Sequence, residues 1–299
     1  MKGRASTTGN QVSEEARPFI KWAGGKRQLL DELTKGFPKF ENYHEPFLGG
    51  GALFFRLEAE GQIKKAYLND SNPELINAYS VIKTDVFGLM AELASPSYAN
   101  NPTAYYKIRA SNPTSRIERA ARFIYLNKTA FNGLYRVNSK GGFNVPFGKY
   151  SNPKILDSEN LLHVHRALQK DELYCGDFTN SLKHAKKGDL VYFDPPYFPI
   201  SKTSNFTSYT KASFSEKDQE RLMRAVKALD SHGCYVLLSN SHSNFISDLY
   251  AEFEPEVVYA SRAINCKGDK RGKIKELIVR NWEPQIAQRK LVEEIVASH

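Results

Sequence analysis

The stretch Leu190-Val191-Tyr192-Phe193-Asp194-Pro195-Pro196-Tyr197 predicts the fold class of the chain. Its first four residues form a continuous apolar run, which is typical of a strand that is buried on both faces of a sheet. Two consecutive prolines exclude both a central strand and a helix interior, so Asp194 to Tyr197 should form a rigid loop at the carboxyl end of that strand. The stretch therefore indicates an α/β protein with a polar loop at one edge of its sheet.

Strands and helices alternate on both sides of this stretch. Short apolar runs predict further strands at 44–48, 66–68 and 235–238. Ser215 and Asp218 form a capping-box pattern, and apolar residues follow them at helical spacing. Apolar strands that alternate with helices predict a Rossmann-like, doubly wound and mostly parallel mixed sheet that is covered on both faces.

The stretch from Pro73 to Ser158 interrupts this alternation. It contains helical patterns, such as the one at 116–129, and ends in Phe143-Asn144-Val145-Pro146-Phe147-Gly148, which is typical of a hairpin or loop. We therefore expect a sheet domain with an inserted, mainly helical module. The expected parts are a flexible amino-terminal tail at 1–16, the sheet domain at 17–72 and 159–283, the inserted module at 73–158 and a carboxyl-terminal tail at 284–299.

The net charge of the 299-residue chain is concentrated in the inserted module. The chain has 42 Lys and Arg against 33 Asp and Glu, which gives a net charge of +9. Between Asn101 and Lys154, ten residues are basic and only Glu118 is acidic, so this stretch carries the whole excess. A basic surface on one module predicts a polyanionic partner.

Composition also excludes several classes of protein. The three cysteines, Cys175, Cys234 and Cys266, are far apart and form no C-x-x-C pair, which argues against a disulfide framework or a zinc cluster. No apolar run reaches the roughly 18 residues of a membrane span. His163 and His165 lie on a helical pattern without further ligands, so we expect no metal. We expect a soluble protein of a reducing cytoplasm.

A second polar loop is predicted after the strand at 44–48. The motif Glu45-Pro46-Phe47-Leu48-Gly49-Gly50-Gly51 lets the backbone pass close to a ligand, and Asp70 ends the next strand, where an acid can accept hydrogen bonds from ribose hydroxyls. This pattern indicates an adenosine-containing cofactor. Phe54 stands where a dinucleotide loop has its third glycine, which favours a cofactor without phosphates. A plain turn with a surface aspartate is the alternative.

The motif Lys21-Trp22-Ala23-Gly24-Gly25-Lys26 is not a phosphate-binding loop. Such a loop requires a glycine at the position of Ile20 and a hydroxyl residue at the position of Arg27. Trp22 could instead stack on a ring, and Lys26 could meet a carboxylate. A structural loop with an extended lysine is the alternative.

The loop from Asp194 to Tyr197 suits the methylation of an exocyclic amine. Such an amine is a poor nucleophile because its lone pair is delocalised into the ring. A carboxylate and a neighbouring backbone carbonyl that both accept from the amine would localise the lone pair, and the prolines would hold that carbonyl in place. Tyr197 offers a face on which a base can stack. A proline turn at a strand end is the alternative.

Taken together and in this order, the motifs resemble those of the Dam-type (D12 class) adenine-N6 DNA methyltransferases, in particular the GATC-methylating enzymes of restriction–modification systems. The resemblance covers the chain from about Pro18 to Trp282. It implies a class I methyltransferase fold and S-adenosylmethionine as the methyl donor. It also implies that the acceptor is adenine N6 in duplex DNA that contains GATC, and that the base is flipped out of the helix.

The resemblance further implies roles for individual residues. Arg136 would hydrogen-bond a guanine, and Phe131 would insert beside the extruded base, where some members carry Tyr. Its catalytic residues would be Asp194, Pro195 and Tyr197. Its cofactor contacts would be Trp22, Lys26, Phe47, Gly49, Gly51, Asp70, Asp177, Phe178 and Asp194. Its DNA contacts would be Lys21, Phe131, Asn132, Leu134, Arg136 and Pro146.

Two alternatives stay open. A methyltransferase that acts on another amine, such as an RNA base or a protein glutamine, commonly has Asn at the position of Asp194, and the basic module also weighs against it. A non-catalytic DNA-binding protein would not need the cofactor loop. We expect a monomer or weak dimer in the cytoplasm, associated with the nucleoid. The sequence leaves open whether the protein belongs to a restriction system, a phage or chromosome maintenance.

Overall fold

The computed structural model describes residues 15–22, 26, 28–198, 214–261 and 273–284. The tails expected at 1–16 and 284–299 therefore lie almost wholly outside the described residues.

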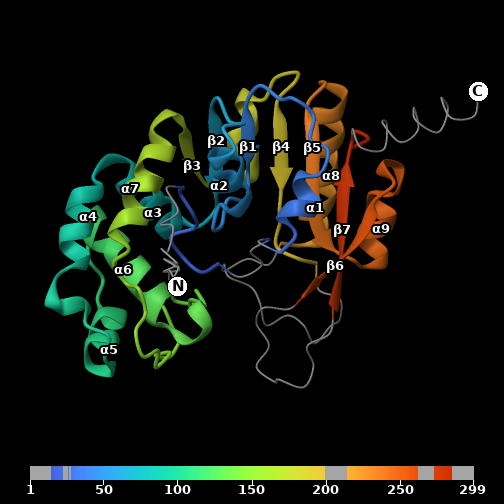
Figure 1. Ribbon diagram of the computed structural model, residues 1–299. Helices are drawn as coiled ribbons and strands as arrows, with labels where there is room; N and C mark the ends of the chain where they lie inside the picture. Colours follow the sequence, from blue (N-terminus) through green and yellow to red (C-terminus); the bar gives the residue numbers. More distant parts are fainter. Residues whose placement is uncertain (1–14, 23–25, 27, 199–213, 262–272, 285–299) are drawn as a thin grey trace, which may run out of the picture.

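Seven strands in the described part of the chain form one sheet, in the order β3-β2-β1-β4-β5-β7-β6 (Figure 1). The first five strands along the chain run parallel, and β7 is antiparallel to both β5 and β6. This arrangement confirms the predicted doubly wound mixed sheet. The strands are β1 Tyr43–Glu45, β2 Ala66–Asp70, β3 Glu172–Cys175, β4 Leu190–Phe193, β5 Tyr235–Ser241, β6 Glu256–Ser261 and β7 Lys273–Arg280.

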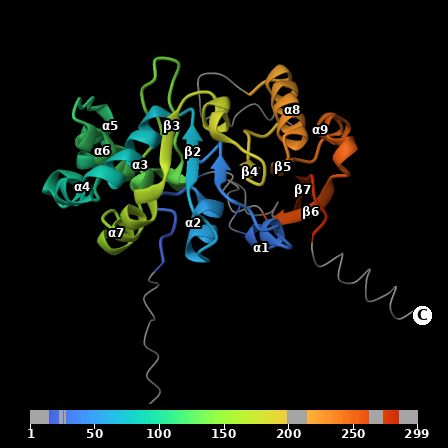
Figure 2. The same cartoon turned by 90° about the horizontal axis from the view of Figure 1, so that it is seen from above.

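Helices cover both faces of the sheet, because side chains of successive strand residues point to opposite sides. In β4, Leu190 and Tyr192 belong to one hydrophobic core, and Val191 and Phe193 belong to the other. Figure 2 shows α1 and α2 on one face and α8 on the opposite face. The helices around the sheet are α1 Leu30–Thr34, α2 Ala52–Ala59, α7 Ser158–Ala167, α8 Glu216–Ser231 and α9 Asn244–Leu249.

Two local predictions can be compared directly with these elements. The capping box is confirmed, because the Ser215 side chain accepts from the Asp218 N–H while the Asp218 side chain accepts from the Ser215 N–H, and α8 begins at the next residue. The strand predicted at 44–48 is shorter, since β1 ends at Glu45. Pro46 follows it and has no N–H to donate to a neighbouring strand.

Four helices dominate the stretch from residue 73 to 129, and an irregular hairpin follows them. The helix predicted at 116–129 is confirmed as α6. Residues 130–148, the hairpin segment, are joined by two antiparallel bridges, Ala130 to Phe147 and Val137 to Phe143. Because α3 also packs against β3 and α7, the domain boundary at residue 73 stays a prediction. The helices are α3 Pro73–Thr84, α4 Val86–Leu93, α5 Pro102–Ala110 and α6 Arg116–Thr129.

Asp171 is a buried carboxyl just before β3. Its Oδ1 accepts a hydrogen bond from the Ala66 N–H at 2.7 Å, whereas Oδ2 is buried without a partner among the described residues. Burial raises the pKa of Asp171 from its ordinary value of 3.8 to about 7. The native state therefore holds this proton more tightly than the unfolded chain does. The stability linked to the proton is fully present below pH 3.8 and is lost as the pH rises through about 7.

We expect the Asp171→Asn variant to gain stability relative to the wild type as the pH rises. The amide keeps an acceptor for the Ala66 N–H and carries no charge to bury. The advantage of the variant should grow by about 2 kcal/mol between pH 5 and pH 8. Urea unfolding of both proteins at the two pH values measures this difference, and a difference that is the same at both would contradict the raised pKa.

Candidate active site

The two polar loops lie side by side where the strand order of the sheet reverses. β1 pairs with β2 on one side and with β4 on the other, so the carboxyl ends of β1 and β4 are adjacent. Residues 46–51, the glycine loop, follow β1, and residues 194–197, the acceptor loop, follow β4. In open α/β sheets, ligands bind at this position because the connections on the two sides leave in opposite directions.

The carboxylate of Asp194 is held through one of its two oxygens. Oδ1 accepts from Lys26 Nζ at 2.6 Å and from Ser239 Oγ at 3.0 Å, and Ser239 Oγ is also 3.0 Å from the Tyr192 hydroxyl. No described residue donates to Oδ2. The carboxylate is therefore fixed in orientation, with one oxygen available as an acceptor.

The acceptor loop is also fixed through its backbone. Pro195 is buried, and the Pro196 carbonyl accepts from Gln219 Nε2 at 3.3 Å. Gln219 Oε1 in turn accepts from Asn240 Nδ2 at 3.1 Å, and both of these side chains are fully buried. The Pro195 carbonyl receives no hydrogen bond from the residues that the structure describes. It is thus the loop carbonyl that can accept from a ligand.

The polar end of β5 supports the acceptor loop, and sequence reasoning missed it. Ser239 contacts Asp194, Asn240 contacts Gln219, and Ser241 Oγ donates to the Phe198 carbonyl at 3.0 Å. All three polar residues are buried. They follow the apolar run at 235–238 directly, but nothing in the sequence alone indicates that these three positions are buried.

Lys26 and Tyr197 meet beside Asp194. Lys26 is buried, and its Nζ lies 4.5 Å from the centroid of the Tyr197 ring. The same Nζ is 3.9 Å from the Glu276 carboxylate of β7. The carboxylates that Lys26 meets in the structure thus belong to the protein itself. The Tyr197 side chain is 37% exposed and presents a ring on which a base can stack.

The glycine loop is packed between two aromatic side chains. A Cβ at Gly49 would lie 2.6 Å from Cδ1 of Trp22, and a Cβ at Gly51 would lie 2.9 Å from the Tyr79 hydroxyl. Both glycines have positive φ, +49° and +66°. The Tyr79 hydroxyl donates to the Gly49 carbonyl at 3.2 Å. Glycine is required at both positions by this packing as well as by the backbone conformation.

Asp70 joins the end of β2 to the glycine loop. Its Oδ2 accepts from the Gly49 N–H and its Oδ1 from the Asn72 N–H, both at 2.9 Å. Burial raises the pKa of Asp70, and the backbone hydrogen bonds partly oppose this increase. Each carboxylate oxygen has a second lone pair, so Asp70 can still accept from a ribose hydroxyl. Its role toward a ribose stays a prediction.

An aromatic wall stands next to Asp70. The Gly176 N–H donates to the Asp70 carbonyl at 3.0 Å, which brings the following residues to this place. Phe178 is buried, and its ring stacks on Phe47 with centroids 5.6 Å apart. Arg221 of α8, which sequence reasoning missed, covers the Phe178 ring at 4.5 Å and pairs with Asp177 at 2.8 Å. A carboxylate, two glycines and an aromatic wall fit an adenosyl group.

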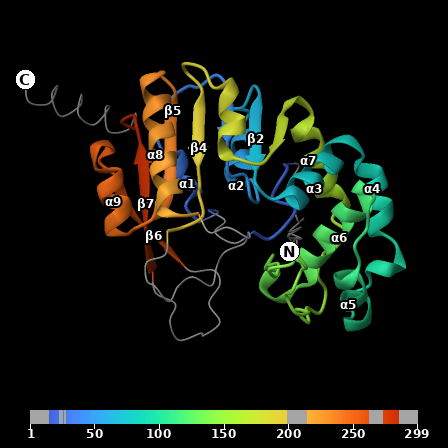
Figure 3. The same cartoon turned by 180° about the vertical axis from the view of Figure 1, so that it is seen from behind.

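The residues predicted to contact DNA are brought together on and beside the hairpin segment. The Phe131 N–H donates to the Pro146 carbonyl at 2.9 Å, which places these two exposed residues together. Arg136 is exposed, and its Nε donates to Asn144 Oδ1 at 2.7 Å. Asn132 has a positive φ of 55°, and the half-buried Leu134 packs against the core. Figures 1 and 3 show the segment on the side toward which β4 points.

Asn127 joins Lys21 to the hairpin segment, and sequence reasoning missed it. This buried residue of α6 accepts from the Lys21 N–H at 2.8 Å and donates to the carbonyls of Lys21 and Gly133 at 2.6 and 3.1 Å. The Lys21 ammonium lies 4.4 Å from the centroid of the Tyr150 ring. An asparagine within the apolar stretch of the predicted helix was the only sequence signal for this role.

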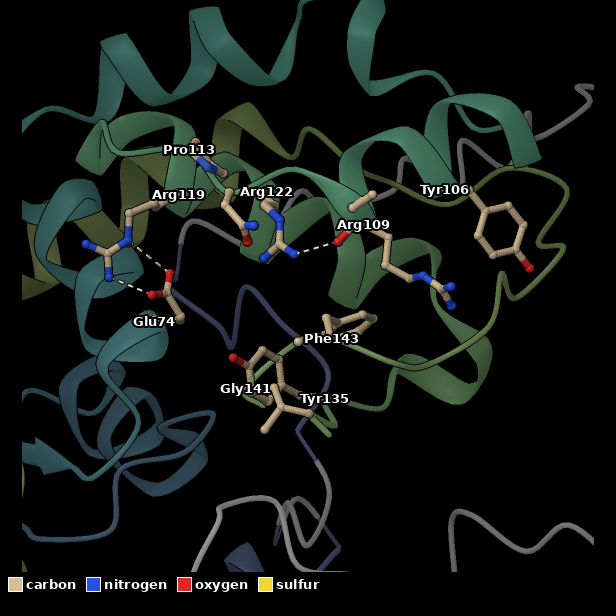
Figure 4. A pocket seen from close by; sticks show the side chains of 13 residues that line it. Glu74, Tyr106, Arg109, Pro113, Arg119, Arg122, Tyr135, Gly141 and Phe143 are labelled. Atoms are coloured by element: carbon tan, nitrogen blue, oxygen red, sulfur yellow. Dashed lines mark hydrogen bonds and ion pairs between the residues drawn. The ribbon is translucent and has the colours of Figure 1, made fainter. Parts of the chain in front are cut away.

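Some of the basic residues of this module make contacts within the protein itself. A pocket of about 450 Å³ is lined by residues of α5, α6 and the hairpin segment, together with Glu74 of α3. Figure 4 shows these side chains. In its wall, Arg119 pairs with Glu74 at 2.5 Å, and Arg122 donates to the Arg109 carbonyl at 2.8 Å. Arg109 itself donates to the Val145 carbonyl at 3.2 Å. These arginines join α6 to α3, α6 to α5, and α5 to the hairpin segment, so the net charge overstates the number of cations available to a polyanion.

Neither a cluster of metal-binding side chains nor a membrane-spanning helix is found among the described residues. No group of three or more His, Cys, Asp or Glu side chains is placed to hold a metal ion in the part of the chain that the structure describes. No helix within those same ranges is long and apolar enough to cross a membrane.

The sheet order, the glycine loop with its acid and the fixed acceptor loop are those of a class I methyltransferase. Residues 22–264 match the family described as D12 class N6 adenine-specific DNA methyltransferase, and the chain belongs to this family. The protein is therefore an adenine-specific DNA methyltransferase, and the family uses S-adenosylmethionine as the methyl donor. The predicted family, fold class and activity are confirmed.

Several relatives are similar to this chain over nearly their whole lengths. The type II methyltransferase M.MjaIII of Methanocaldococcus jannaschii is 44% identical over 288 residues, which cover 90% of this chain and 100% of the relative. The type II methyltransferase M1.LlaDCHI of Lactococcus lactis subsp. cremoris is 46% identical over 275 residues, or 89% and 95% of the two chains. The DNA adenine methylase of Escherichia coli K12 is 36% identical over 266 residues, or 88% and 94%.

Proposed function

We propose that the protein methylates N6 of the adenine in GATC sequences of duplex DNA, after rotating that adenine out of the helix. The observation that carries the proposal is the hydrogen bonding of the Asp194 carboxylate. Lys26 and Ser239 donate to its Oδ1, while Oδ2 accepts no hydrogen bond from the described residues. A base inside a duplex cannot reach such a site, so the base must leave the stack.

The acceptor loop would activate the amine through two hydrogen bonds. Asp194 Oδ2 and the Pro195 carbonyl are the two acceptors, and each would accept a hydrogen bond from one N–H of the amine. The amine lone pair is then directed out of the ring plane, and stacking on Tyr197 holds the base in that orientation. When bound, S-adenosylmethionine supplies a methyl group on a positively charged sulfur. We infer that Asp70, the glycine loop and the aromatic wall hold it, with Trp22 and Lys26 nearby.

The hairpin segment would determine the specificity for the DNA sequence. Arg136 gives its Nε–H to Asn144, which leaves both terminal nitrogens for O6 and N7 of one guanine. Phe131 is 43% exposed, so its ring can fill the gap that the adenine leaves. We propose that Lys21 reads the outer guanine, that Leu134 and Pro146 touch neighbouring bases, and that Asn132 contacts a phosphate. We also propose that the protein acts as a monomer or weak dimer on the nucleoid, in the cytoplasm.

Methyl transfer to defined duplexes tests this function. The protein is incubated with S-adenosylmethionine labelled in its methyl group and with one of two duplexes, which differ only in whether GATC is intact or its four bases are rearranged. We expect label in N6-methyladenine of the GATC duplex and little in the other. Equal labelling of both would refute GATC as the target, and a lack of labelled adenine in either would refute the function.

A further inference from the structure

Arg221 is a half-buried cation that joins the second turn of α8 to the segment after β3. Its Nη2 donates to Asp177 Oδ2 at 2.8 Å and lies 3.5 Å from Asp218 Oδ1. Its Cζ lies 4.5 Å from the centroid of the Phe178 ring. A single guanidinium thus contacts both residues that are predicted to surround the adenine of the methyl donor.

The contact between Arg221 and Phe178 is a cation–π interaction that is partly shielded from water. Phe178 is only 3% exposed, and Nε of Arg221 is buried without a hydrogen-bond partner in the described part of the chain. Loss of water strengthens the attraction between a guanidinium and the face of an aromatic ring. A buried N–H without a partner costs free energy, so the ring and the carboxylates must hold the guanidinium in this place.

The same contacts fix the wall beside the glycine loop. The Phe178 ring stacks on Phe47 of that loop, with centroids 5.6 Å apart and an angle of 27° between the planes. Asp177 Oδ1 accepts from the Thr179 N–H at 3.1 Å and from the Thr179 hydroxyl at 2.8 Å, while Oδ2 accepts from Arg221. Partial burial would raise the pKa of Asp177, but these hydrogen bonds lower it below its ordinary value. The carboxylate therefore stays charged and keeps one orientation.

Helix α8 contacts both halves of the site. Gln219 of this helix donates to the Pro196 carbonyl of the acceptor loop at 3.3 Å, and Arg221 follows it by two residues. Residues two apart lie about 200° apart around a helix. Gln219 is fully buried, whereas 42% of the Arg221 side chain is exposed. The acceptor loop and the wall are thus held by two sides of one helix.

We propose that Arg221 is a positioning residue for the methyl donor, which holds Asp177 and Phe178 where they contact the adenine of S-adenosylmethionine. This inference rests on the proposed function, because it assumes that the aromatic wall holds that adenine. Arg221 acts through these two residues. Without its guanidinium, Asp177 loses the donor to Oδ2 and the Phe178 ring loses the cation that covers it. Part of the binding free energy of the donor would then be spent on ordering the wall.

Binding of S-adenosylhomocysteine, the donor without its methyl group, measures this role in the absence of DNA and of methyl transfer. Calorimetric titration of Arg221→Ala should give a dissociation constant about 5- to 10-fold above that of the wild type, which is the combined size of an exposed ion pair and a cation–π contact. Arg221→Lys should recover only part of the loss, because a compact ammonium lacks the planar face of a guanidinium.

Two further proteins show whether the effect passes through the wall. Arg224→Ala is the matched control, because Arg224 is an exposed arginine on the next turn of α8, and it should bind S-adenosylhomocysteine as the wild type does. Adding Arg221→Ala to Phe178→Leu should raise the dissociation constant by a smaller factor than Arg221→Ala does alone, because residues in contact are not independent.

Steady-state methylation of a GATC duplex separates positioning of the donor from a general loss of folded protein. We expect the KM for S-adenosylmethionine to rise with the dissociation constant, while kcat at saturating donor and the KM for DNA stay close to the wild-type values. An Arg221→Ala variant that binds S-adenosylhomocysteine as tightly as the wild type would overturn the inference. So would a lower kcat with an unchanged KM for the donor. If the wild type itself binds no S-adenosylhomocysteine or methylates no GATC duplex, the proposed function fails instead.

Discussion

Replacing Asp194 by alanine is expected to lower the rate of methyl transfer about 1,000-fold, the usual effect of removing a polar group that stabilises a transition state. The variant loses the only side-chain oxygen of the acceptor loop that is placed to accept from the amine. It also leaves the Lys26 ammonium without its 2.6 Å partner, next to an amine that becomes positively charged as the new bond forms. Binding of duplex DNA should stay within a few-fold, because the hairpin segment is unchanged.

Single-turnover methylation and DNA binding, measured on the same preparations, check this expectation. Asp248→Ala is the matched control, because Asp248 is an exposed aspartate of α9. The control should methylate DNA at the wild-type rate. Methyl transfer by Asp194→Ala within tenfold of the wild type would show that the carboxylate is not the amine acceptor.

Replacing Arg136 by alanine should relax sequence choice. We expect the preference for GATC over a site with one guanine changed to fall by about 1–3 kcal/mol, which is roughly 5- to 150-fold. The physical reason is the free pair of terminal nitrogens, which matches the two acceptors of guanine in the major groove. Asn144 keeps the guanidinium in one orientation by accepting from Nε.

Competition between duplexes in one reaction measures this preference directly. Lys140→Ala is the matched control, because Lys140 is an exposed cation near the tip of the same hairpin segment. It should weaken binding to every duplex by a similar factor and leave the preference unchanged. If Arg136→Ala behaves in the same way, Arg136 contacts only the backbone of DNA.

Local patterns were enough to predict most of the fold. The strand at 190–193 is four buried apolar residues, and the helix after Ser215 begins with a complete capping box, so neighbouring residues determine both elements. The place of β7 between β5 and β6 could not be predicted in this way. It depends on pairing between β7 and a strand more than thirty residues earlier in the chain, which no local pattern encodes.

The same distinction between local patterns and distant contacts applies to the candidate site. The acceptor loop was visible because its carboxylate, prolines and tyrosine are consecutive in the sequence. The groups that hold it were not, because Ser239 and Gln219 come from a strand and a helix that meet only in the folded chain. Each of them is a polar residue at a buried position. Such residues are recognisable as unusual only after the burial of each position is known.

The late position of β7 in the chain has a consequence for biosynthesis. During translation, the polypeptide up to residue 241 already contains both polar loops, Lys26 and the serine that contacts Asp194. Glu276, whose carboxylate lies 3.9 Å from Lys26 Nζ, is synthesised later, as part of the strand that inserts between β5 and β6. A nascent chain therefore contains both polar loops before the sheet that supports them is complete. Competence should begin only when synthesis has passed β7, and a nick that releases this strand should inactivate the enzyme while leaving every recognisable motif intact.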